Sequence, residues 1–261
     1  MEVHQIYTFS FLRNFSYVLE SPESKFAYCI DPWDADQIIE ILNKKSLKLK
    51  AIINTHEHGD HTRGNESLVK KTGCQVWAHK NAKGKISGID TFLNGGEEIS
   101  LERGWSLRVL DTPGHTFAHL CLLLEGPDGP TGLFSGDTLF NAGVGNCHNG
   151  GDPEVLFETV SEQLKDLPGD VLLYPGHEYL ENNLGFTLDR EPSNAKARDL
   201  FNEVQKINPL PSGYRIFNMD LERKINTFFR LENEEIRKGL PGVVDSDKQV
   251  FLRLRELRNK W

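Results

Sequence analysis

The segment Thr55-His56-Glu57-His58-Gly59-Asp60-His61 places three imidazoles and the Asp60 carboxylate within six residues. It directly follows an apolar stretch, 49–54, that we expect to be a strand. His56 and His58 are two residues apart and can face the same way, while Asp60 and His61 reach a second position a short distance on. Imidazole and carboxylate suit zinc, iron or manganese, and the motif has no cysteine of the kind that closes a structural zinc site. A surface loop that is rich in histidine by chance is the alternative, which this spacing at a strand end disfavours.

Further residues that suit a metal follow three other predicted strands, as His115, Asp137 and His177. A single histidine or aspartate in such a position is more often structural than a ligand. Loops at one end of a sheet are, however, where open α/β folds assemble their sites. The seven side chains, five His and two Asp, exceed what one tetrahedral ion needs and are enough for two metals that share a carboxylate. The pattern predicts a dinuclear hydrolase site.

The elements that must position these residues mix strands and helices up to about residue 178. Strands are expected on both sides of a turn at 12–14, within 3–20, and at 49–54, 75–78, 107–110, 120–124, 133–135 and 171–174. Helices are expected after Asp34, over 64–71 before Gly73, and from Asp152 to Pro168-Gly169. Beyond residue 178 helical periodicity dominates, around 193–207, 218–238 and 246–259. We therefore predict an α/β (α+β) sandwich over 1–178 and a smaller helical domain over 179–261.

Composition limits the partners of the chain. Its 261 residues include 30 Lys and Arg against 38 Asp and Glu, a net charge of −8 that disfavours phosphate backbones and anionic lipid. No apolar run approaches the roughly 18 residues of a membrane helix, and no basic segment followed by an apolar one begins the sequence. The four cysteines are scattered without a C-x-x-C pair. We expect a cytoplasmic monomer or weak oligomer that acts on a small molecule, with no nucleic-acid or membrane partner.

The motifs around these seven residues resemble the metallo-β-lactamase superfamily, whose signature is His-x-His-x-Asp-His with distal His, Asp and His. Within it, the sequence is most similar to glyoxalase II, the hydroxyacylglutathione hydrolases. The similarity extends through Gly176-His177-Glu178-Tyr179 to the tail Leu254-Arg255-Glu256-Leu257-Arg258-Asn259, and so covers nearly the whole chain. It implies an αββα metallo-β-lactamase sandwich with a smaller C-terminal helical domain that binds substrate.

The resemblance also implies a role for each ligand. His56, His58 and His115 hold one divalent metal; Asp60, His61 and His177 hold the other, and Asp137 bridges the two. The resemblance implies that Asp60 and Asp137 are the catalytic residues, and that Asp60 steers the attacking hydroxide. Zinc is expected first, with iron or manganese as alternatives because cellular supply decides.

On the substrate side, the resemblance implies that Tyr179 contacts the glutathione portion and that Arg255 and Arg258 bind its glycine carboxylate. The family usually has lysine where Arg258 stands. For both arginines the alternative is a solvated face of a terminal helix.

The loop after Asp137 departs from the family pattern. Asn146 replaces a basic residue, and Cys147-His148 replaces an aromatic pair, among side chains that normally help to bind the thiol carrier. We keep Asn146 and His148 as expected substrate contacts, and the identity of the carrier stays open. Cys147 is expected to be a loop thiol rather than a nucleophile.

Two residues outside the ligand set are placed to support it. Asp31 follows an early strand in Ile30-Asp31-Pro32 and can orient a ligand histidine, unless it only begins a turn. His119 lies four residues after His115, where a packed structural role is favoured over a contact with the ligands.

Together these features predict a metal-dependent hydrolase that cleaves S-D-lactoylglutathione, or a similar S-2-hydroxyacylglutathione, to glutathione and a 2-hydroxy acid in methylglyoxal detoxification. A hydroxide bridging two metals is expected to attack the thioester carbonyl. A hydrolase of another thioester or of a lactone is the nearest alternative. A persulfide dioxygenase usually lacks Gly-His-Glu-Tyr and the long tail, a nuclease would want a basic surface, and an electron-transfer module would want a flavin partner.

Overall fold

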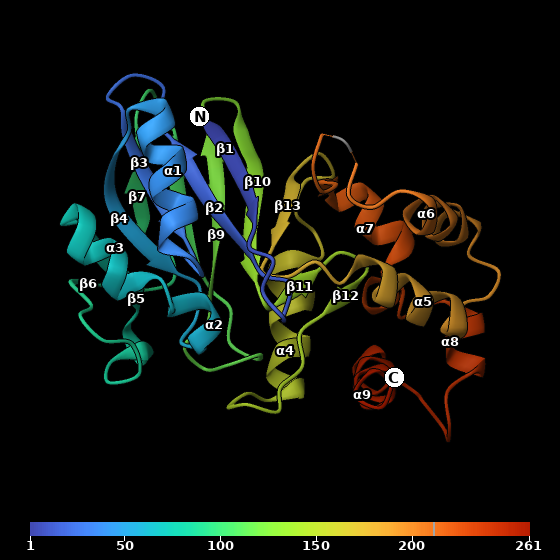
Figure 1. The fold of residues 1–261 in the computed structure, drawn as a ribbon. Helices are drawn as coiled ribbons and strands as arrows, with labels where there is room; N and C mark the ends of the chain where they lie inside the picture. Colours follow the sequence, from blue (N-terminus) through green and yellow to red (C-terminus); the bar gives the residue numbers. More distant parts are fainter. Residues whose placement is uncertain (211) are drawn as a thin grey trace. The chain divides into compact units, whose positions relative to one another are not determined.

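The computed structural model describes residues 1–210 and 212–261, which form two compact units (Figure 1). The first unit contains residues 1–112, 117–136 and 174–178, and the second contains residues 113–116, 137–173 and 179–261. The chain therefore passes between the units several times. The predicted division after residue 178 follows chain order instead, and it stays a prediction.

The first unit contains a six-stranded sheet in the order β1-β2-β3-β4-β5-β6. β1 to β3 pair antiparallel, and β3 to β6 pair parallel. The bounds of the six strands are Glu2–Tyr7, Phe15–Glu20, Phe26–Ile30, Lys48–Asn54, Gln75–His79 and Thr91–Leu93. The predicted turn at 12–14 lies between β1 and β2. Because β4 ends at Asn54, the histidine-rich segment leaves the sheet at the carboxyl end of a buried parallel strand.

A second sheet faces the first. Within the first unit its order is β13-β10-β9-β8-β7. The bounds are Glu98–Ser100 (β7), Ser106–Asp111 (β8), Leu120–Gly126 (β9), Gly129–Gly136 (β10) and Leu172–Pro175 (β13). Tyr17 of β2 packs against Phe134 of β10 and Tyr174 of β13, with ring centroids 5.3 and 5.5 Å away. Edge-to-face aromatic packing of this kind joins the inner faces of the two sheets.

Helices α1 (Ala35–Lys45) and α3 (Asn65–Thr72) cover the other face of the first sheet (Figure 1). Ile38 of α1 and Leu68 of α3 are buried in one apolar cluster with residues of the sheet. The predicted helix ends are confirmed: Asp34 accepts the N–H of Asp36, and Gly73 ends α3 with φ 70. Two short elements complete this unit, α2 (Gly59–Thr62) and the 3₁₀ turn η1 (Lys80–Ala82).

The second unit contains most of the helices. Its elements are β11 (Leu139–Phe140), β12 (Gly143–Val144), α4 (Pro153–Thr159), the π-helical turn η2 (Val160–Leu164), α5 (Leu180–Arg190), α6 (Ala195–Lys206), β14 (Phe217–Asn218), α7 (Met219–Ile225), the 3₁₀ turn η3 (Thr227–Phe229), α8 (Glu234–Lys238) and α9 (Asp247–Arg258). β14 pairs with the beginning of β13. α5 and α6 share an apolar cluster that includes Leu184, Leu200 and Val204.

The predicted helical stretches of this unit are confirmed with two differences, and α5 was not among them. The helix predicted from Asp152 continues from Val160 as the π-helical turn η2. Asp152 and Ser246 cap α4 and α9 through their side chains. The stretch 218–238 is divided into α7, η3 and α8. Asn226 and Asn233 account for the division, because their side chains accept N–H groups at the start of η3 and of α8.

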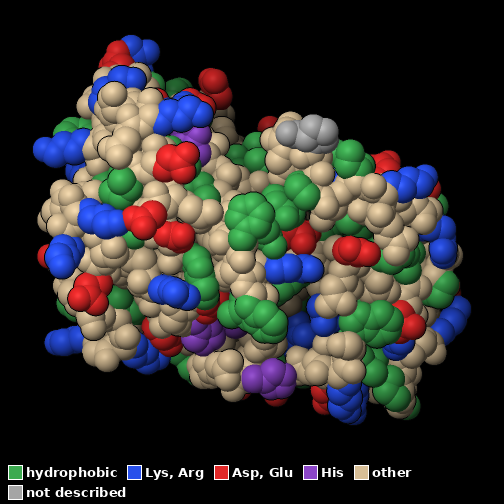
Figure 2. Space-filling view, in the orientation of Figure 1, with side chains coloured by type: hydrophobic (Ala, Val, Ile, Leu, Met, Phe, Trp, Pro, Cys, Tyr) green, Lys and Arg blue, Asp and Glu red, His purple; other side chains and the backbone are tan. Residues whose placement is uncertain are grey.

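The surface carries both signs of charge. On the face drawn in Figure 2, basic and acidic side chains are interspersed rather than gathered into one broad field. Among the residues that the structure describes, no helix is both long enough and apolar enough to span a bilayer. The absence of a nucleic-acid partner stays a prediction.

Glu222 of α7 is a carboxyl that is completely buried in the second unit. Its Oε2 accepts the N–H of Ala142 at 2.8 Å and the Nδ2–H of Asn226 at 3.3 Å. Burial opposes ionisation more than these bonds favour it, and it raises the pKa of Glu222 to about 8.

This shift predicts that Glu222→Gln gains stability relative to the native chain as the pH rises from about 5 to 8. In the unfolded chain the carboxyl loses its proton near its ordinary pKa of about 4.3, whereas in the folded chain it keeps the proton until about pH 8. The native chain therefore loses stability over this interval, and glutamine does not titrate. Urea unfolding of both proteins at several pH values measures the difference, and a difference that does not change with pH would contradict the prediction.

Candidate metal centre

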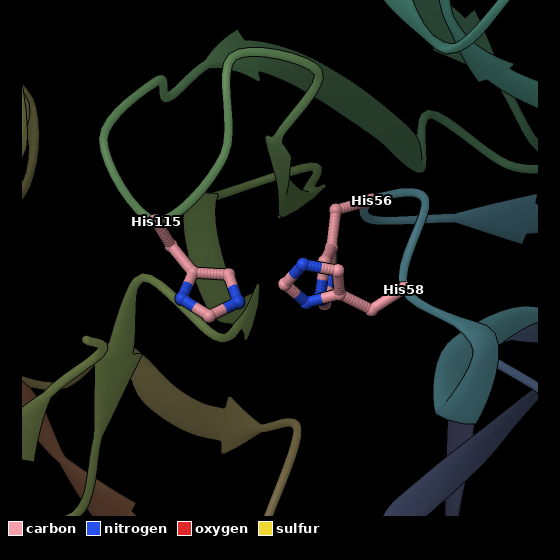
Figure 3. Close-up of side chains that lie close together, drawn as sticks. All are labelled: His56, His58 and His115. Atoms are coloured by element: carbon pink, nitrogen blue, oxygen red, sulfur yellow. The ribbon is translucent and has the colours of Figure 1, made fainter. Parts of the chain in front are cut away.

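His56 and His58 lie on the loop that follows β4 and turn their rings toward each other (Figure 3). His56 Nε2 is 3.0 Å from His58 Nδ1. The rings meet edge to face, with centroids 4.6 Å apart, and His56 is almost completely buried. Two imidazole nitrogens at this distance can form an N–H···N hydrogen bond, or both can bind the same cation. The rings as they lie are suited to either arrangement.

A second cluster of donor atoms is formed by Asp60, His61 and His177. Asp60 Oδ2 is 3.3 Å from His61 Nε2 and 3.4 Å from His177 Nε2, and the two Nε2 atoms are 3.3 Å apart. Ligands about 2.05 Å from a tetrahedral ion are about 3.3 Å from one another. The spacing of these three atoms therefore fits three corners of a tetrahedral metal site.

The tautomers of both histidines in this cluster are determined by their other ring nitrogen. His61 Nδ1 is 2.9 Å from Asp31 Oδ2, and His177 Nδ1 is 2.8 Å from the carbonyl oxygen of Leu12. Both partners only accept, so each Nδ1 carries the proton and each Nε2 presents a lone pair to the cluster. Asp60 is oriented in a similar way, because Asn14 Nδ2 donates to its Oδ2 at 2.8 Å.

Asp31 has the supporting role that the sequence suggests. Besides His61, its buried carboxylate accepts the backbone N–H of Thr55 at 2.8 Å and the Thr55 hydroxyl at 2.6 Å. Asp31 therefore links Thr55, which follows β4, to His61 in α2.

We expect Asp31→Ala to weaken metal binding by about 10- to 100-fold, because His61 loses the partner that sets its tautomer and orientation. Competition between the protein and a chromophoric chelator measures the affinity. Asp34→Ala, which removes only a helix cap, is the matched control. Equal affinities for the native chain and Asp31→Ala would contradict this role.

His115 and Asp137 are the predicted ligands that lie in the second unit. His115 comes from the loop after β8 and is labelled in Figure 3, and Asp137 follows the last residue of β10. Both are nearly buried, and His115 Nε2 is 3.5 Å from Asp137 Oδ2. Gly145 lies directly beside them: a Cβ on Gly145 would meet Asp137 O at 1.9 Å and His115 Nδ1 at 3.1 Å. Glycine is required there because any side chain would collide with this pair.

The five predicted substrate-binding residues line one cavity of the second unit, about 240 Å³ in volume. We call it the carrier cavity. Its lining consists of Phe140, Val144, Asn146, His148, Tyr179, Asn183, Arg255, Arg258, Asn259 and Trp261. Among the residues that the structure describes, this lining includes two arginines and no aspartate or glutamate, so the cavity has side chains that suit an anion.

The two arginines differ from a solvated helix face. Arg255 is 5% exposed, and burial lowers its pKa to about 10. Its Nη1 donates to the carbonyl oxygens of Val144 and Gly145 at 2.7 and 3.1 Å. Arg258 Nη2 donates to Asn183 Oδ1 at 3.0 Å, and burial lowers its pKa as well. The solvated alternative is therefore wrong for Arg255, and Arg258 is only partly accessible.

Cys147 lies in the loop after β12, as expected, and His119 has the packed role that the sequence favours. Burial raises the pKa of Cys147 to about 11, so its thiol is not a thiolate at neutral pH. His119 is completely buried, with its Nδ1 2.9 Å from Thr112 Oγ1. Its ring also stacks on His56, with centroids 5.0 Å apart, so the contact with a predicted ligand that the sequence disfavours is present as well.

Asn14 and the carbonyl of Leu12 were missed as functional groups. Both lie in the turn between β1 and β2, and they contact Asp60 and His177. The sequence identifies a turn there, but it contains no signal that this turn contacts residues far along the chain.

Comparison with known proteins agrees with these features. The metallo-beta-lactamase superfamily model matches residues 14–177, and the model of the hydroxyacylglutathione hydrolase C-terminus matches residues 178–261. A curated relative from Nitrosococcus oceani, named hydroxyacylglutathione hydrolase, is 48% identical, with all of both chains covered.

Solved structures show the same fold. ETHE1 from Myxococcus xanthus aligns with a TM-score of 0.67 at 22% identity, over 99% of this chain and 98% of its own. TTHA1623 in a di-iron-bound form aligns with a TM-score of 0.55 at 26% identity, over 70% of this chain and 97% of its own. The predicted fold class is confirmed. The chain belongs to the metallo-β-lactamase superfamily and, within it, to the hydroxyacylglutathione hydrolase (glyoxalase II) family.

Proposed function

We propose that this protein is a hydroxyacylglutathione hydrolase, which cleaves the thioester of S-D-lactoylglutathione and similar S-2-hydroxyacylglutathiones. Water is consumed, the acyl carbon–sulfur bond breaks, and glutathione and a 2-hydroxy acid are released. The observation that carries the proposal is the triangle of Asp60 Oδ2, His61 Nε2 and His177 Nε2, with sides of 3.3–3.4 Å. Three such donors with their lone pairs directed at one point fit a hydrolytic metal better than a structural one.

The metal ligands that we propose are those implied by the family. His56, His58 and His115 would hold one divalent ion, Asp60, His61 and His177 the other, and Asp137 would bridge. Two ions held by such a set would supply a water molecule of lowered pKa and a Lewis acid for the thioester carbonyl. The nitrogen and carboxylate donors suit zinc first, and iron or manganese as alternatives.

The residues of this chain contribute orientation and charge. Asp60, held by Asn14, has one carboxylate oxygen within reach of both histidines of its cluster, so it can also direct the proton of the attacking water. Asp31 and the Leu12 carbonyl keep His61 and His177 in one tautomer. The departing thiol needs little acid assistance, because its pKa of about 8.5 makes it a good leaving group.

We propose that the carrier cavity binds the glutathione part of the substrate. Arg258 and Arg255 supply positive charge for the glycine carboxylate, and Tyr179, Asn146 and His148 form other walls. Asn146 and His148 stand where the family usually has a basic and an aromatic residue that help to bind the thiol carrier. Because this difference leaves the carrier open, the family's own carrier, glutathione, is the one to test first.

The test is hydrolysis of S-D-lactoylglutathione by protein loaded with zinc, iron or manganese, beside the same protein treated with chelator. We expect chelator-sensitive release of one glutathione for each 2-hydroxy acid. A protein that binds two metals and does not turn over this substrate would contradict the proposal, and the alternatives would then be another thioester or a lactone. Action in methylglyoxal detoxification, a cytoplasmic location and a monomeric or weakly oligomeric state also remain proposals.

A further inference from the structure

The turn between β11 and β12 has an unfavourable backbone conformation. Leu139 pairs with Val144 and Phe140 with Gly143, so Asn141 and Ala142 form a two-residue turn. Ala142 has φ 58, in the left-handed region that glycine or asparagine usually occupies. A turn of this kind with alanine at the left-handed position needs support from its surroundings.

The support comes from side chains of the helices that follow. Asn183 Nδ2 donates to the Asn141 carbonyl at 2.9 Å, and Asn226 Nδ2 donates to the Gly143 carbonyl at 3.2 Å. Ala142 itself donates its N–H to Glu222 Oε2 at 2.8 Å. The main chain of 141–143 is therefore bonded to three side chains, which belong to α5, to α7 and to the residue that follows α7.

Glu222 is the most unusual of these supports. It is completely buried, and its Oε1 has no hydrogen-bond partner among the residues that the structure describes. A buried carboxyl that leaves one oxygen unused is costly, and apolar packing alone would be served better by leucine or methionine. The bond to the Ala142 N–H is the contribution that only an acceptor at this position can make.

The turn is also a wall of the carrier cavity. Phe140 and Val144, on either side of the turn, both line the cavity. The Val144 carbonyl accepts from Arg255, and the ring of Phe140 lies 5.3 Å from that of Tyr179. A change in the turn would therefore move side chains that face a bound ligand, without altering a metal ligand.

We propose that Glu222 is a positioning residue of the carrier cavity: by accepting the Ala142 N–H, it holds the turn, and with it Phe140 and Val144, in the arrangement that binds the thiol carrier. The identity of the carrier rests on the proposed function. The positioning of the turn does not.

The experiment compares Glu222→Ala, Glu222→Gln and Glu191→Ala. Glu191 is a matched control, because it is equally buried in this unit and its carboxylate accepts from Arg230, Asn194 and Asn233 instead of the turn. With S-D-lactoylglutathione, we expect Glu222→Ala to raise KM about tenfold, the effect of losing the buried hydrogen bond to the turn, and to change kcat less than about twofold. Glu222→Gln keeps an acceptor and should restore KM, and Glu191→Ala should leave KM unchanged.

Hydrogen exchange of the peptide 139–146 provides a readout that does not depend on turnover. We expect faster exchange there in Glu222→Ala than in the native chain, Glu222→Gln or Glu191→Ala. Unchanged exchange in Glu222→Ala, or an equal increase in Glu191→Ala, would overturn the proposal, as would a fall in kcat with KM unchanged. If the native chain does not hydrolyse the thioester, the proposed function fails and the exchange comparison alone decides the role of Glu222.

Discussion

Replacing Asp60 by alanine is expected to lower kcat/KM for S-D-lactoylglutathione by about a thousandfold or more, because a proposed metal ligand is lost and a bound ion would then acidify its water less. Asp60 Oδ2 is one of three donor atoms that lie 3.3–3.4 Å from one another. The remaining two nitrogens can still bind an ion weakly, but they leave it without the carboxylate that balances its charge.

The fold should tolerate this substitution. Asp60 is partly exposed and lies in the four-residue helix α2, outside the apolar clusters. Steady-state kinetics, metal content and thermal unfolding should be measured together, with Asp36→Ala as the control. Asp36 is an aspartate of the same unit whose exposed side chain forms an ion pair with Lys71. Activity of Asp60→Ala within tenfold of the native chain, at full metal content, would be incompatible with the assignment of Asp60.

The proposed metal ligands stand out in the sequence because they are tied to local signals. Each follows a strand whose apolar residues are readily identified, and strand ends on one side of a sheet bring their loops together. β4, β8, β10 and β13 all end just before a predicted ligand. The residue types then limit the chemistry, since imidazole and carboxylate at such spacing have few other uses.

Unlike that of Asp31, the supporting contacts of Asn14 and Leu12 could not be predicted, because they join one turn to residues far along the chain. Asn14 reaches Asp60, and Leu12 reaches His177, 165 residues later along the chain. No periodicity or propensity in 8–14 indicates these partners. They depend on the pairing of β1 with β2 and on where β13 ends, which are properties of the folded sheets.

The same reasoning explains what was missed in the helical part. Helix propensity indicates that 218–238 is helical, but capping by Asn226 and Asn233 divides it. In the sequence, Glu222 has the pattern of an ordinary charged residue on the polar face of an amphipathic helix. Only the structure places it in the interior beside Ala142.

Arg258→Met is expected to raise KM for S-D-lactoylglutathione about 10- to 100-fold with kcat nearly unchanged, because a charge-assisted hydrogen bond contributes about 1.5–3 kcal/mol. Methionine keeps an unbranched apolar chain in place of the aliphatic part of the arginine and removes the charged guanidinium group. The effect should fall on KM because the carboxylate that we propose Arg258 binds is remote from the reacting thioester. This carboxylate is therefore bound equally in the ground state and in the transition state.

Arg253→Met is the matched control, since Arg253 is an arginine of the same helix that is exposed and pairs with Glu256. A substrate whose glycine carboxylate is converted to an amide completes a double-mutant cycle. If Arg258 binds that carboxylate, the native chain loses affinity for the amide, and Arg258→Met does not distinguish the amide from the acid. Equal losses in the two proteins would assign Arg258 to packing of the cavity through Asn183, because additivity means that the charge and the carboxylate do not interact.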